Sequence, residues 1–323
     1  MKQAMINFVG KVDSAVSKMN ISFFNERSSV IVVLFHGLFE DSRQITSNHV
    51  DPQQRIVVAH FRIFVEYFLN NDYIFISSKD ILEGLDENKK YVVVTFDDGY
   101  YNNYVSLPVL AEYKIPAIYF ISTNHILQGK CFWWDVIYRE RVRRGCSLRD
   151  ISKENSSLKR FKNNEIEKYI ETTFGENALR PIGDIDRPFT PDELHHFSMS
   201  PYVEIGNHTR NHAILTNYSG EEIRGEILGA QDDIDKISGI RPIVISYPNG
   251  NYSDEVIEIS KELGLNLGII VNGQKNYHPI TGTDDLRFKL NRYILWGTKD
   301  IVRQCESFRS DVHVFNYCKK IFK

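Results

Sequence analysis

Short apolar runs alternate with helical patterns along most of this chain. The runs that predict strands are continuous and rich in β-branched and aromatic residues, and they are Val30–Phe35, Tyr73–Ile76, Tyr91–Phe96, Ala117–Ile121, Val203–Gly206, Ile243–Tyr247 and Leu265–Val271. Apolar residues spaced three and four apart predict the helices between them, near Phe61–Leu69, Lys79–Leu85, Tyr104–Tyr113, Glu221–Ile237 and Ser253–Gly264. Strands that alternate with helices of about 10–15 residues are typical of a parallel α/β sheet or barrel.

The segment Gly129–Arg187 interrupts this alternation. It is rich in Arg, Lys, Asn and Glu, and it holds a helical pattern at Asn164–Phe174 without an obvious strand. We interpret it as a helical insertion in the barrel. After it, Thr190 and Glu193 are spaced as the N-cap and the closing residue of a capping box, with Pro191 at the first helical position, so a helix should begin there.

The composition fits a globular chain of enzyme size. Of the 323 residues, 42% are hydrophobic and 25% are charged, which allows a sizeable core and excludes wholesale disorder. The formal net charge of −3 gives no basic excess of the kind that a nucleic-acid-binding protein usually carries, so we expect no nucleic-acid partner. The four cysteines form no CxxC pair, and we expect them to be reduced thiols.

The N-terminal residues predict a helix and no signal peptide. Lys11, Asp13 and Lys18 interrupt the place where a signal peptide has an unbroken apolar core. No stretch approaches the roughly 18 apolar residues of a membrane span, so we expect a cytoplasmic protein without a transmembrane segment. The expected organisation is an N-terminal helical segment at 1–28, a barrel at 29–300 with the insertion at about 129–187, and a C-terminal helix or tail at 301–323.

Two adjacent carboxylates after a predicted strand are the first candidate for chemistry. Asp97 and Asp98 come directly after Tyr91–Phe96 and are followed by Gly99, which allows a sharp turn. Adjacent carboxylates repel each other unless a cation lies between them or one of them is protonated. In α/β barrels the C-terminal ends of the strands carry the chemistry. On this stretch alone, a solvated Asp-Asp-Gly turn would fit equally well.

Two histidines after a second strand favour the catalytic interpretation of the carboxylate pair over a solvated turn. His208 and His212 follow Val203–Gly206 and are spaced four apart, so in a helical turn both imidazoles would project to one side. One carboxylate and two imidazoles form a three-ligand metal site that leaves positions open for water and substrate. A histidine pair at this spacing is weak evidence alone, but together with the carboxylate pair after another strand it predicts a metal centre.

These motifs resemble those of a known family. Thr95–Gly99 (TFDDG) and His208–His212 (HTRNH) are similar to the first two motifs of the polysaccharide deacetylases, the NodB-homology domains of carbohydrate esterase family 4. Val33–His36 resembles the first-strand stretch of the bacterial branch, and Ile245–Gly250 resembles the third motif. The resemblance covers most of the chain. It implies an α/β fold of the distorted, TIM-like (β/α)7 barrel type, and the metal-dependent removal of an acyl group from an amino sugar.

The resemblance also implies roles for single residues. Asp98, His208 and His212 would be the metal ligands, and Asp97 would be the general base that takes a proton as water attacks. The cofactor would be one divalent metal ion; we expect Zn²⁺, although the same ligands suit Co²⁺, Ni²⁺ and Fe²⁺. A backbone N–H near Asn249 would hold the oxyanion together with the metal.

Two roles of the family have no clear counterpart at their usual positions. The third motif often contains an arginine that orients the base, and Ser246 stands there in this chain. Arg292, near the end of another strand, is a candidate replacement, although a surface arginine would fit equally well. The late histidine that usually protonates the leaving amine is also missing. His36 is the best-placed candidate for that role because it ends a strand, as the ligands do.

The candidate substrate-binding residues are Tyr247, Pro248 and Asn249 of the third-motif stretch and Trp134 of a Phe-Trp-Trp-Asp run. Neighbouring indoles can line a sugar groove, but paired tryptophans more often anchor an insertion to the core. Four arginines between residues 139 and 144 are interpreted as a solvated helix face. The alternative is that they contact a phosphate or an anionic lipid headgroup.

We expect a hydrolase of non-peptide carbon–nitrogen bonds that removes an acetyl or formyl group from an N-acylated sugar. Its substrate would be a nucleotide sugar, a lipid-linked sugar or another precursor of a cell-surface polysaccharide, and a lipid-linked substrate would bring peripheral membrane contact. The alternatives are an amidohydrolase that acts on a non-sugar amide and a carbohydrate-binding protein that has lost turnover. An iron oxygenase uses similar ligands but usually has a jelly-roll sheet. The sequence leaves the oligomeric state open.

Overall fold

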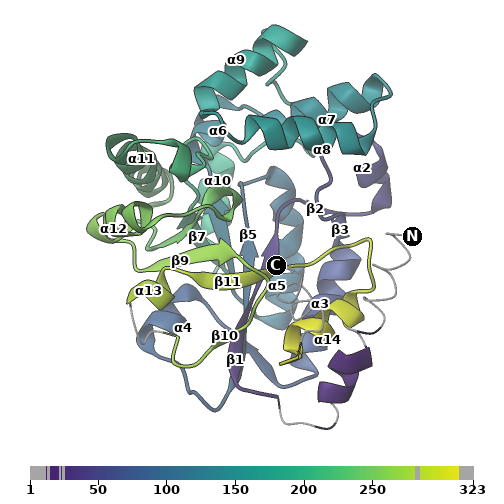
Figure 1. The fold of residues 1–323 in the computed structure, drawn as a ribbon, viewed down its shortest axis with the longest axis vertical. Coiled ribbons are helices and arrows are strands. Elements are labelled where there is room, and N and C mark those ends of the chain that lie inside the picture. Colours follow the sequence, from purple (N-terminus) through teal and green to yellow (C-terminus); the bar gives the residue numbers. More distant parts are fainter. Residues whose placement is uncertain (1–11, 13–14, 22, 24–25, 281–283, 313–323) are drawn as a thin grey trace.

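Parallel strands form a closed ring at the centre of the protein. The computed structural model describes residues 12, 15–21, 23, 26–280 and 284–312. Within these residues the ring has seven strands, and they are, in ring order, β1 (Ser29–Phe35), β5 (Lys90–Phe96), β6 (Ala117–Ile121), β7 (Val203–Asn207), β8 (Val244–Ser246), β9 (Leu267–Val271) and β11 (Leu290–Ile294). The ring closes because β1 pairs in parallel with both β5 and β11. The predicted (β/α)7 barrel is therefore confirmed, and Figure 1 shows the helices around it.

Two short strands flank the ring without joining it. β4 (Tyr73–Phe75) pairs with the first half of β5, and β10 (Asn276–Tyr277) pairs antiparallel with the start of β1. The run predicted at Tyr73–Ile76 is thus a strand outside the ring. The seventh ring strand is β11, whose apolar run is interrupted by Asn291 and Arg292.

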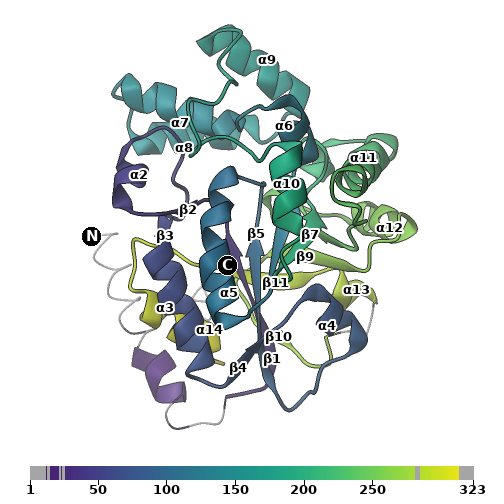
Figure 2. The same ribbon diagram turned by 180° about the vertical axis from the view of Figure 1, so that it is seen from behind.

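Helices connect the strands and cover the outside of the barrel, as Figure 2 shows for α3, α5 and α10. The helices around the barrel are α2 (Ser42–Thr46), α3 (Val58–Leu69), α4 (Ser78–Glu83), α5 (Leu107–Tyr113), α6 (Thr123–Gln128), α10 (Pro191–Ser198), α11 (Gly220–Ser238), α12 (Asp254–Glu262), α13 (Asp284–Arg287) and α14 (Ile301–Arg309). The single helix predicted at Tyr104–Tyr113 is divided into the 3₁₀ helix η1 (Tyr101–Ser106) and α5. Pro108 lies at the start of α5, where its missing N–H costs no helical hydrogen bond.

Side chains of the strands alternate between an outer and an inner layer. The outer layer packs between the strands and the helices, and it includes Ile31, Val33, Phe35, Val92, Val94 and Phe96. The inner layer includes Val93 of β5 and Leu290 of β11. Two residues further along each strand, the same alternation brings Thr95 and Arg292 inside the barrel, where Arg292 Nη1 donates to Thr95 Oγ1 over 3.2 Å. Polar side chains therefore enter the barrel at the C-terminal ends of its strands.

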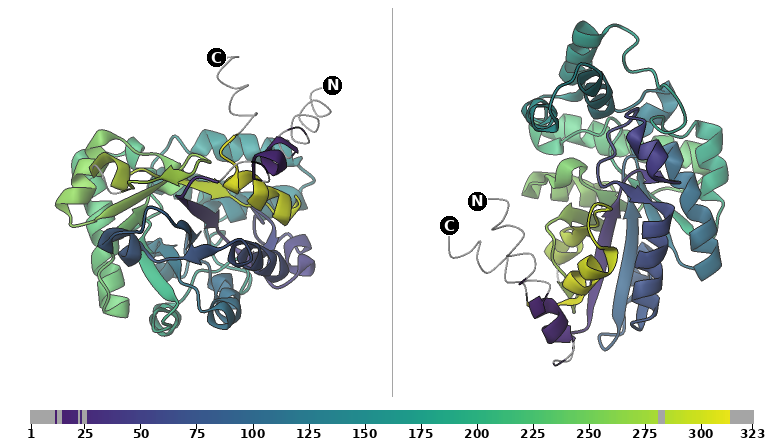
Figure 3. Two further views of the ribbon diagram at one scale, coloured as in Figure 1. Left: turned by 90° about the horizontal axis from the view of Figure 1, so that it is seen from below. Right: turned by 90° about the vertical axis from the view of Figure 1, so that its right-hand side faces the viewer.

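The connection between β6 and β7 carries three further helices, α7 (Trp133–Arg143), α8 (Leu148–Leu158) and α9 (Asn163–Phe174). They lie over the C-terminal ends of the barrel strands, as the right-hand view of Figure 3 shows. Their apolar side chains form a cluster with Phe39 and Tyr100 of the barrel loops. The helical content predicted for Gly129–Arg187 is confirmed, and its description as an insertion within a domain at 29–300 stays a prediction.

The two ends of the chain are only partly described. Residues 15–21 are helical, in agreement with the predicted N-terminal helical segment at 1–28, most of whose remaining residues lie outside the described ranges. At the other end, α14 packs beside α3, and residues 313–323 lie outside the described ranges. In the described part of the chain, no helix is long and apolar enough to cross a membrane.

The predicted capping box at the start of α10 is present. Thr190 Oγ1 accepts the N–H of Glu193 over 3.3 Å, and Thr190 N–H donates to Glu193 Oε2 over 2.9 Å. We expect Thr190→Ala to lower the free energy of unfolding by about 1 kcal/mol, because one helix N–H loses its acceptor. Urea unfolding measures this change. Thr172→Ala, at an exposed position inside α9, is the matched control, and an equal midpoint in the two variants would contradict the prediction.

Candidate metal centre

The loops after β5 and β7 carry the two motifs to the same end of the barrel. After β5, Asp98 and Gly99 have φ values of 77° and 93°, so the chain makes a sharp left-handed turn there. After β7, Thr209 and His212 also have positive φ values, of 61° and 52°. The segment His208–His212 is therefore a loop, and the helical turn expected from its spacing is wrong. The loop brings the two imidazoles together instead.

Three side chains converge in this place. Asp98 Oδ1 lies 3.5 Å from His208 Nε2 and 3.3 Å from His212 Nε2. One ligand atom from each residue lies within 4.8 Å of the others, so the three could hold one metal ion. Asp98 and His208 are buried, whereas His212 is partly exposed. Two buried ligands and one at the surface leave an open side through which water and substrate can enter.

The donor chemistry fits a cation. Both oxygens of the Asp98 carboxylate are buried and accept no hydrogen bond of normal geometry from a described residue. His208 Nδ1–H donates to the Ser246 carbonyl over 2.7 Å, so Nε2 is the ring nitrogen directed at the Asp98 carboxylate. Burial would lower the pKa of His208, but Asp97 and Asp98 raise it, because a proton on this imidazole pairs with the carboxylates. A divalent ion could take the place of that proton between Nε2 and Asp98. Burial alone would raise the pKa of Asp98, but His36, His208 and His212 hold it well below its usual range.

Asp97 lies beside these ligands and is held by an arginine inside the barrel. Arg292 Nη1 donates to Asp97 Oδ1 over 2.8 Å, and Nη2 donates to the other carboxylate oxygen of Asp97. Ser246 Oγ accepts from Arg292 Nη2 over 2.8 Å and donates to Asp97 Oδ2 over 3.2 Å. Burial would raise the pKa of Asp97, but Arg292 and His208 lower it, so the carboxylate is ionised at neutral pH.

Arg292 is only 1% exposed, so the alternative of a surface arginine is wrong. It reaches Asp97 from β11, whereas the family position, on β8, holds Ser246. The two residues act together, since Arg292 donates to both oxygens of Asp97 and Ser246 Oγ links the guanidinium to the same carboxylate. The arrangement orients Asp97 with one lone pair left for a further partner.

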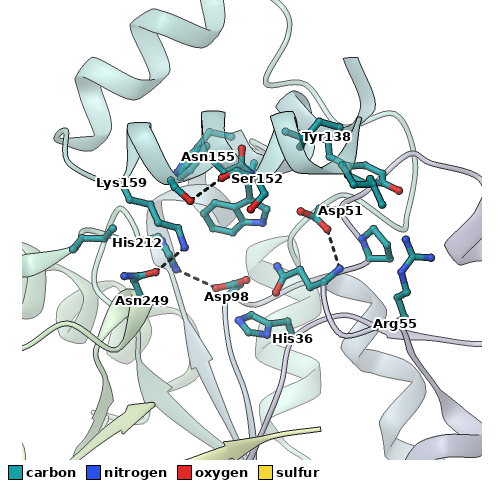
Figure 4. Close-up of a pocket in the computed structure, with 18 of the residues that line it drawn as sticks. His36, Asp51, Arg55, Asp98, Tyr138, Ser152, Asn155, Lys159, His212 and Asn249 are labelled. Carbon is teal, nitrogen blue, oxygen red and sulfur yellow. Dashed lines mark hydrogen bonds and ion pairs between the residues drawn. The ribbon is translucent and has the colours of Figure 1, made fainter. Parts of the chain in front are cut away.

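Two of the candidate ligands, Asp98 and His212, line a cavity of about 650 Å³, drawn in Figure 4. The barrel, the loop before β3 (Ile56–Val57) and the insertion each contribute one wall. The lining residues are His36, Asp51, Pro52, Gln53, Arg55, Asp98, Trp133, Trp134, Tyr138, Leu148, Ile151, Ser152, Asn155, Ser156, Lys159, His212, Ile214, Asn249 and Trp296. A cavity of this volume can enclose a small ligand such as a sugar residue.

Of the other predicted site residues, His36 and Trp134 line this cavity. His36 lies next to Asp98 on the cavity floor (Figure 4), and its Nδ1 lies 2.9 Å from Gln54 Oε1. Trp134 anchors the insertion and also lines the cavity, while its contact with a sugar stays a prediction. Its Nε1–H donates to the Tyr100 hydroxyl over 2.9 Å, which anchors the insertion, and its ring lies 4.7 Å from that of His212, at the cavity wall.

The third-motif residues are divided between the cavity and the core. Asn249 lines the cavity and has a left-handed φ of 60°. Tyr247 and Pro248 are buried and are absent from the described cavity lining, so the structure does not support direct substrate contact by either side chain. The Tyr247 ring packs in an apolar cluster, where a Cβ on Gly268 would lie 2.4 Å from its hydroxyl. Tyr247 therefore packs in the core against Gly268, and any larger residue at position 268 would collide with its ring.

Asp135, on α7, joins this helix to two other segments behind the cavity wall, and the sequence did not indicate this role. Its side chain is fully buried, its Oδ2 accepts the Tyr100 hydroxyl over 2.8 Å, and its Oδ1 accepts the backbone N–H of Asp51 over 2.9 Å. Burial raises the pKa of Asp135 well above its usual range. The carboxyl group therefore supports the wall from behind, beside Trp134.

The arginines of α7 are occupied by partners within the protein. Arg139 is buried and pairs with Asp186 over 2.7 Å, and Arg141 pairs with Glu154 over 2.8 Å. Arg143 pairs with Glu140, and the Arg144 guanidinium lies over the Phe174 ring. The solvated face expected from the sequence is therefore wrong for Arg139. The phosphate-binding alternative also loses its support, because the paired guanidiniums already have acceptors.

The fold and the site together define a (β/α)7-barrel protein with a three-residue candidate metal centre at the C-terminal ends of its strands. The chain belongs to the polysaccharide deacetylase family, whose model matches residues 84–268, more than half of its length. The matched range contains Asp97, Asp98, His208 and His212. This family consists of hydrolases that act on carbon–nitrogen bonds other than peptide bonds, which is the predicted enzyme class.

Individual relatives agree with this assignment. The peptidoglycan-N-acetylmuramic acid deacetylase PdaC of Bacillus subtilis (strain 168) is 43% identical over 53 residues, which are 16% of this chain and 11% of that protein. The Streptococcus pyogenes deacetylase PplD, solved in complex with acetate, superimposes with a TM-score of 0.58 at 18% identity, over 87% of this chain and 99% of that one. A polysaccharide deacetylase from Bacillus cereus gives 0.59 at 17% identity, over 87% and 69% of the two chains. At such identities the structures support the fold alone.

Proposed function

We propose that this protein is a metal-dependent N-deacylase of an amino sugar. The observation that carries the proposal is the buried Asp98 carboxylate, which accepts no hydrogen bond of normal geometry from the described residues and lies 3.5 Å from His208 Nε2 and 3.3 Å from His212 Nε2. A divalent ion held by these residues would polarise the acyl carbonyl and lower the pKa of water. Zn²⁺ is the ion we propose, and Co²⁺, Ni²⁺ and Fe²⁺ suit the same ligands.

Asp97 is the proposed general base. Its carboxylate is ionised and is held in one orientation by Arg292 and Ser246, next to the candidate ligands. It would accept the proton of the attacking water. His36 is the proposed general acid that gives a proton to the leaving amine, because it lies on the cavity floor beside Asp98 (Figure 4). Gln54 would fix the orientation of its ring through Nδ1.

The proposed substrate is an N-acetylated or N-formylated sugar that belongs to the synthesis of a cell-surface polysaccharide. Membership of the deacetylase family supports an acylated sugar. The cavity supports a single sugar residue or a chain end, because the insertion covers the barrel mouth with the side chains of α7 and α8. PdaC, by its name, acts on an N-acetylated sugar of peptidoglycan.

Metal removal and replacement tests the proposal. The protein is purified without a chelating tag, its metal content is measured by elemental analysis, and acetate or formate release from N-acylated glucosamines is followed. We expect about one ion per chain, loss of acyl release on dialysis against a chelator, and recovery with zinc. Acyl release that is unchanged in metal-free protein would contradict the proposal. An intact metal site without acyl release from any of these sugars would favour a carbohydrate-binding protein instead.

A further inference from the structure

One face of α8 forms the roof of the cavity. Six cavity-lining residues follow one another at helical spacing along α8 and its C-cap, and they are Leu148, Ile151, Ser152, Asn155, Ser156 and Lys159. Steps of three and four residues place side chains on one side of a helix, here over about 16 Å. The half of this face nearer to the C-terminus of α8 is polar. Asn155 Oδ1 is buried there without a hydrogen-bond partner among the described residues, so a ligand hydroxyl could donate to it.

The charge of the cavity is positive once a divalent ion is bound. Its acidic lining residues are Asp51 and Asp98, which together balance the two charges of the ion. Arg55 and Lys159 also line the cavity and leave an excess of positive charge. Figure 4 shows Lys159 and Arg55 on opposite sides of Asp98. Such a cavity attracts anions and disfavours a cationic ligand.

Of the two basic side chains that line the cavity, Arg55 and Lys159, Lys159 is the one that lies on the side of His212 in Figure 4. Its Nζ donates to Asn249 Oδ1 over 2.7 Å, and Figure 4 shows it beside His212. The amide oxygen is a neutral acceptor, so this contact orients the ammonium group without neutralising it. The two remaining N–H groups of Nζ can donate to a ligand. A neutral glycan would displace water from this ammonium group without placing a negative charge beside it.

We propose that the cavity selects an acylated sugar that carries an oxyanion, either a carboxylate or a phosphate, and that Lys159 binds this group. The inference rests on the proposed function and names the class of sugar that the same site would take. Arg55 adds a second positive charge at the opposite wall, beside Tyr138. A charge-assisted hydrogen bond of this kind favours the anionic over the neutral sugar by about 10- to 100-fold in affinity.

Tryptophan fluorescence can measure this preference without any turnover. The chain has three tryptophans, Trp133, Trp134 and Trp296, and all of them line the cavity. Three ligands are titrated into metal-free and zinc-loaded protein at low ionic strength: N-acetylmuramic acid, N-acetylglucosamine 1-phosphate and neutral N-acetylglucosamine. Metal-free protein separates the contribution of Lys159 from direct binding of the oxyanion to zinc. The two anionic ligands distinguish a glycan carboxylate from the phosphate of an activated sugar.

We expect at least one anionic sugar to bind about 10-fold or more tightly than the neutral one, in both forms of the protein. Lys159→Gln should remove this preference, and Lys159→Arg should keep most of it. Lys153→Gln is the matched control, because Lys153 lies on the same helix, is 65% exposed and pairs with Asp150 away from the cavity. Equal affinities for the three sugars would overturn the inference, as would equal effects of Lys159→Gln and Lys153→Gln. An anionic preference without acyl release would overturn the proposed function alone.

Discussion

His208→Ala and His212→Ala should each abolish stable metal binding and slow acyl release by about 10³-fold or more, because the loss of one imidazole leaves the ion with two protein ligands. The His208 variant carries an extra cost. It removes a buried side chain and leaves the Ser246 carbonyl without the donor it has at 2.7 Å. His212 is partly exposed, so its replacement tests metal binding with less effect on the fold.

Elemental analysis, acyl release and thermal unfolding check this prediction together. A ligand that binds only the folded protein raises its apparent stability, so zinc should raise the Tm of the unmodified protein and leave that of the His212 variant unchanged. His196→Ala is the matched control, since His196 is an exposed histidine of α10 outside the site. If His212→Ala had the same metal content and activity as the unmodified protein, the three-ligand centre would be contradicted.

Most of the barrel could be predicted because its strands are buried on both sides. A strand of a closed parallel barrel packs against helices outside and side chains inside, so Tyr91–Phe96 is a nearly unbroken apolar run. β11 gives a weaker signal because Asn291 and Arg292 interrupt its apolar run, so the sequence indicates it only as a strand end that carries Arg292. Side chains alternate along a strand, and this places Arg292 in the barrel interior. The resemblance made Arg292 a candidate for orienting Asp97, whereas the residues alone left a surface arginine equally possible, because the pairing depends on the register of strands across the ring.

The ligands of the site could be predicted, but most of the residues of its walls could not. Asp98, His208 and His212 are marked by residue type and by the strands before them, whereas the positive φ values that bring them together leave no signal in the spacing. α8 shows the opposite difficulty. Half of its cavity-facing side is polar and only Ile151 and Leu158 are buried, so the apolar positions of this helix are few. Lys159 at its end therefore resembled any surface lysine.

Arg292→Met should slow acyl release by about 10³-fold while the metal content stays unchanged, because Arg292 orients Asp97 without contacting the candidate ligands' donor atoms. The same change should lower the free energy of unfolding by about 3–5 kcal/mol, since it leaves a buried carboxylate without its partner. Arg292→Lys keeps the charge but cannot form both hydrogen bonds to the carboxylate, so its activity should lie between those of the other two proteins.

A double variant separates orientation of the base from a general loss of structure. Asp97→Asn alone should remove the proposed base, and adding Arg292→Met to it should slow the reaction little further, because the two residues act as one unit. The double variant should also unfold at a higher urea concentration than Arg292→Met alone, since no unpaired carboxylate remains in the barrel. Arg303→Met, at an exposed position of α14, controls for the loss of an arginine. Fully multiplicative rate losses in the double variant would mean that Arg292 serves the reaction by a route other than Asp97.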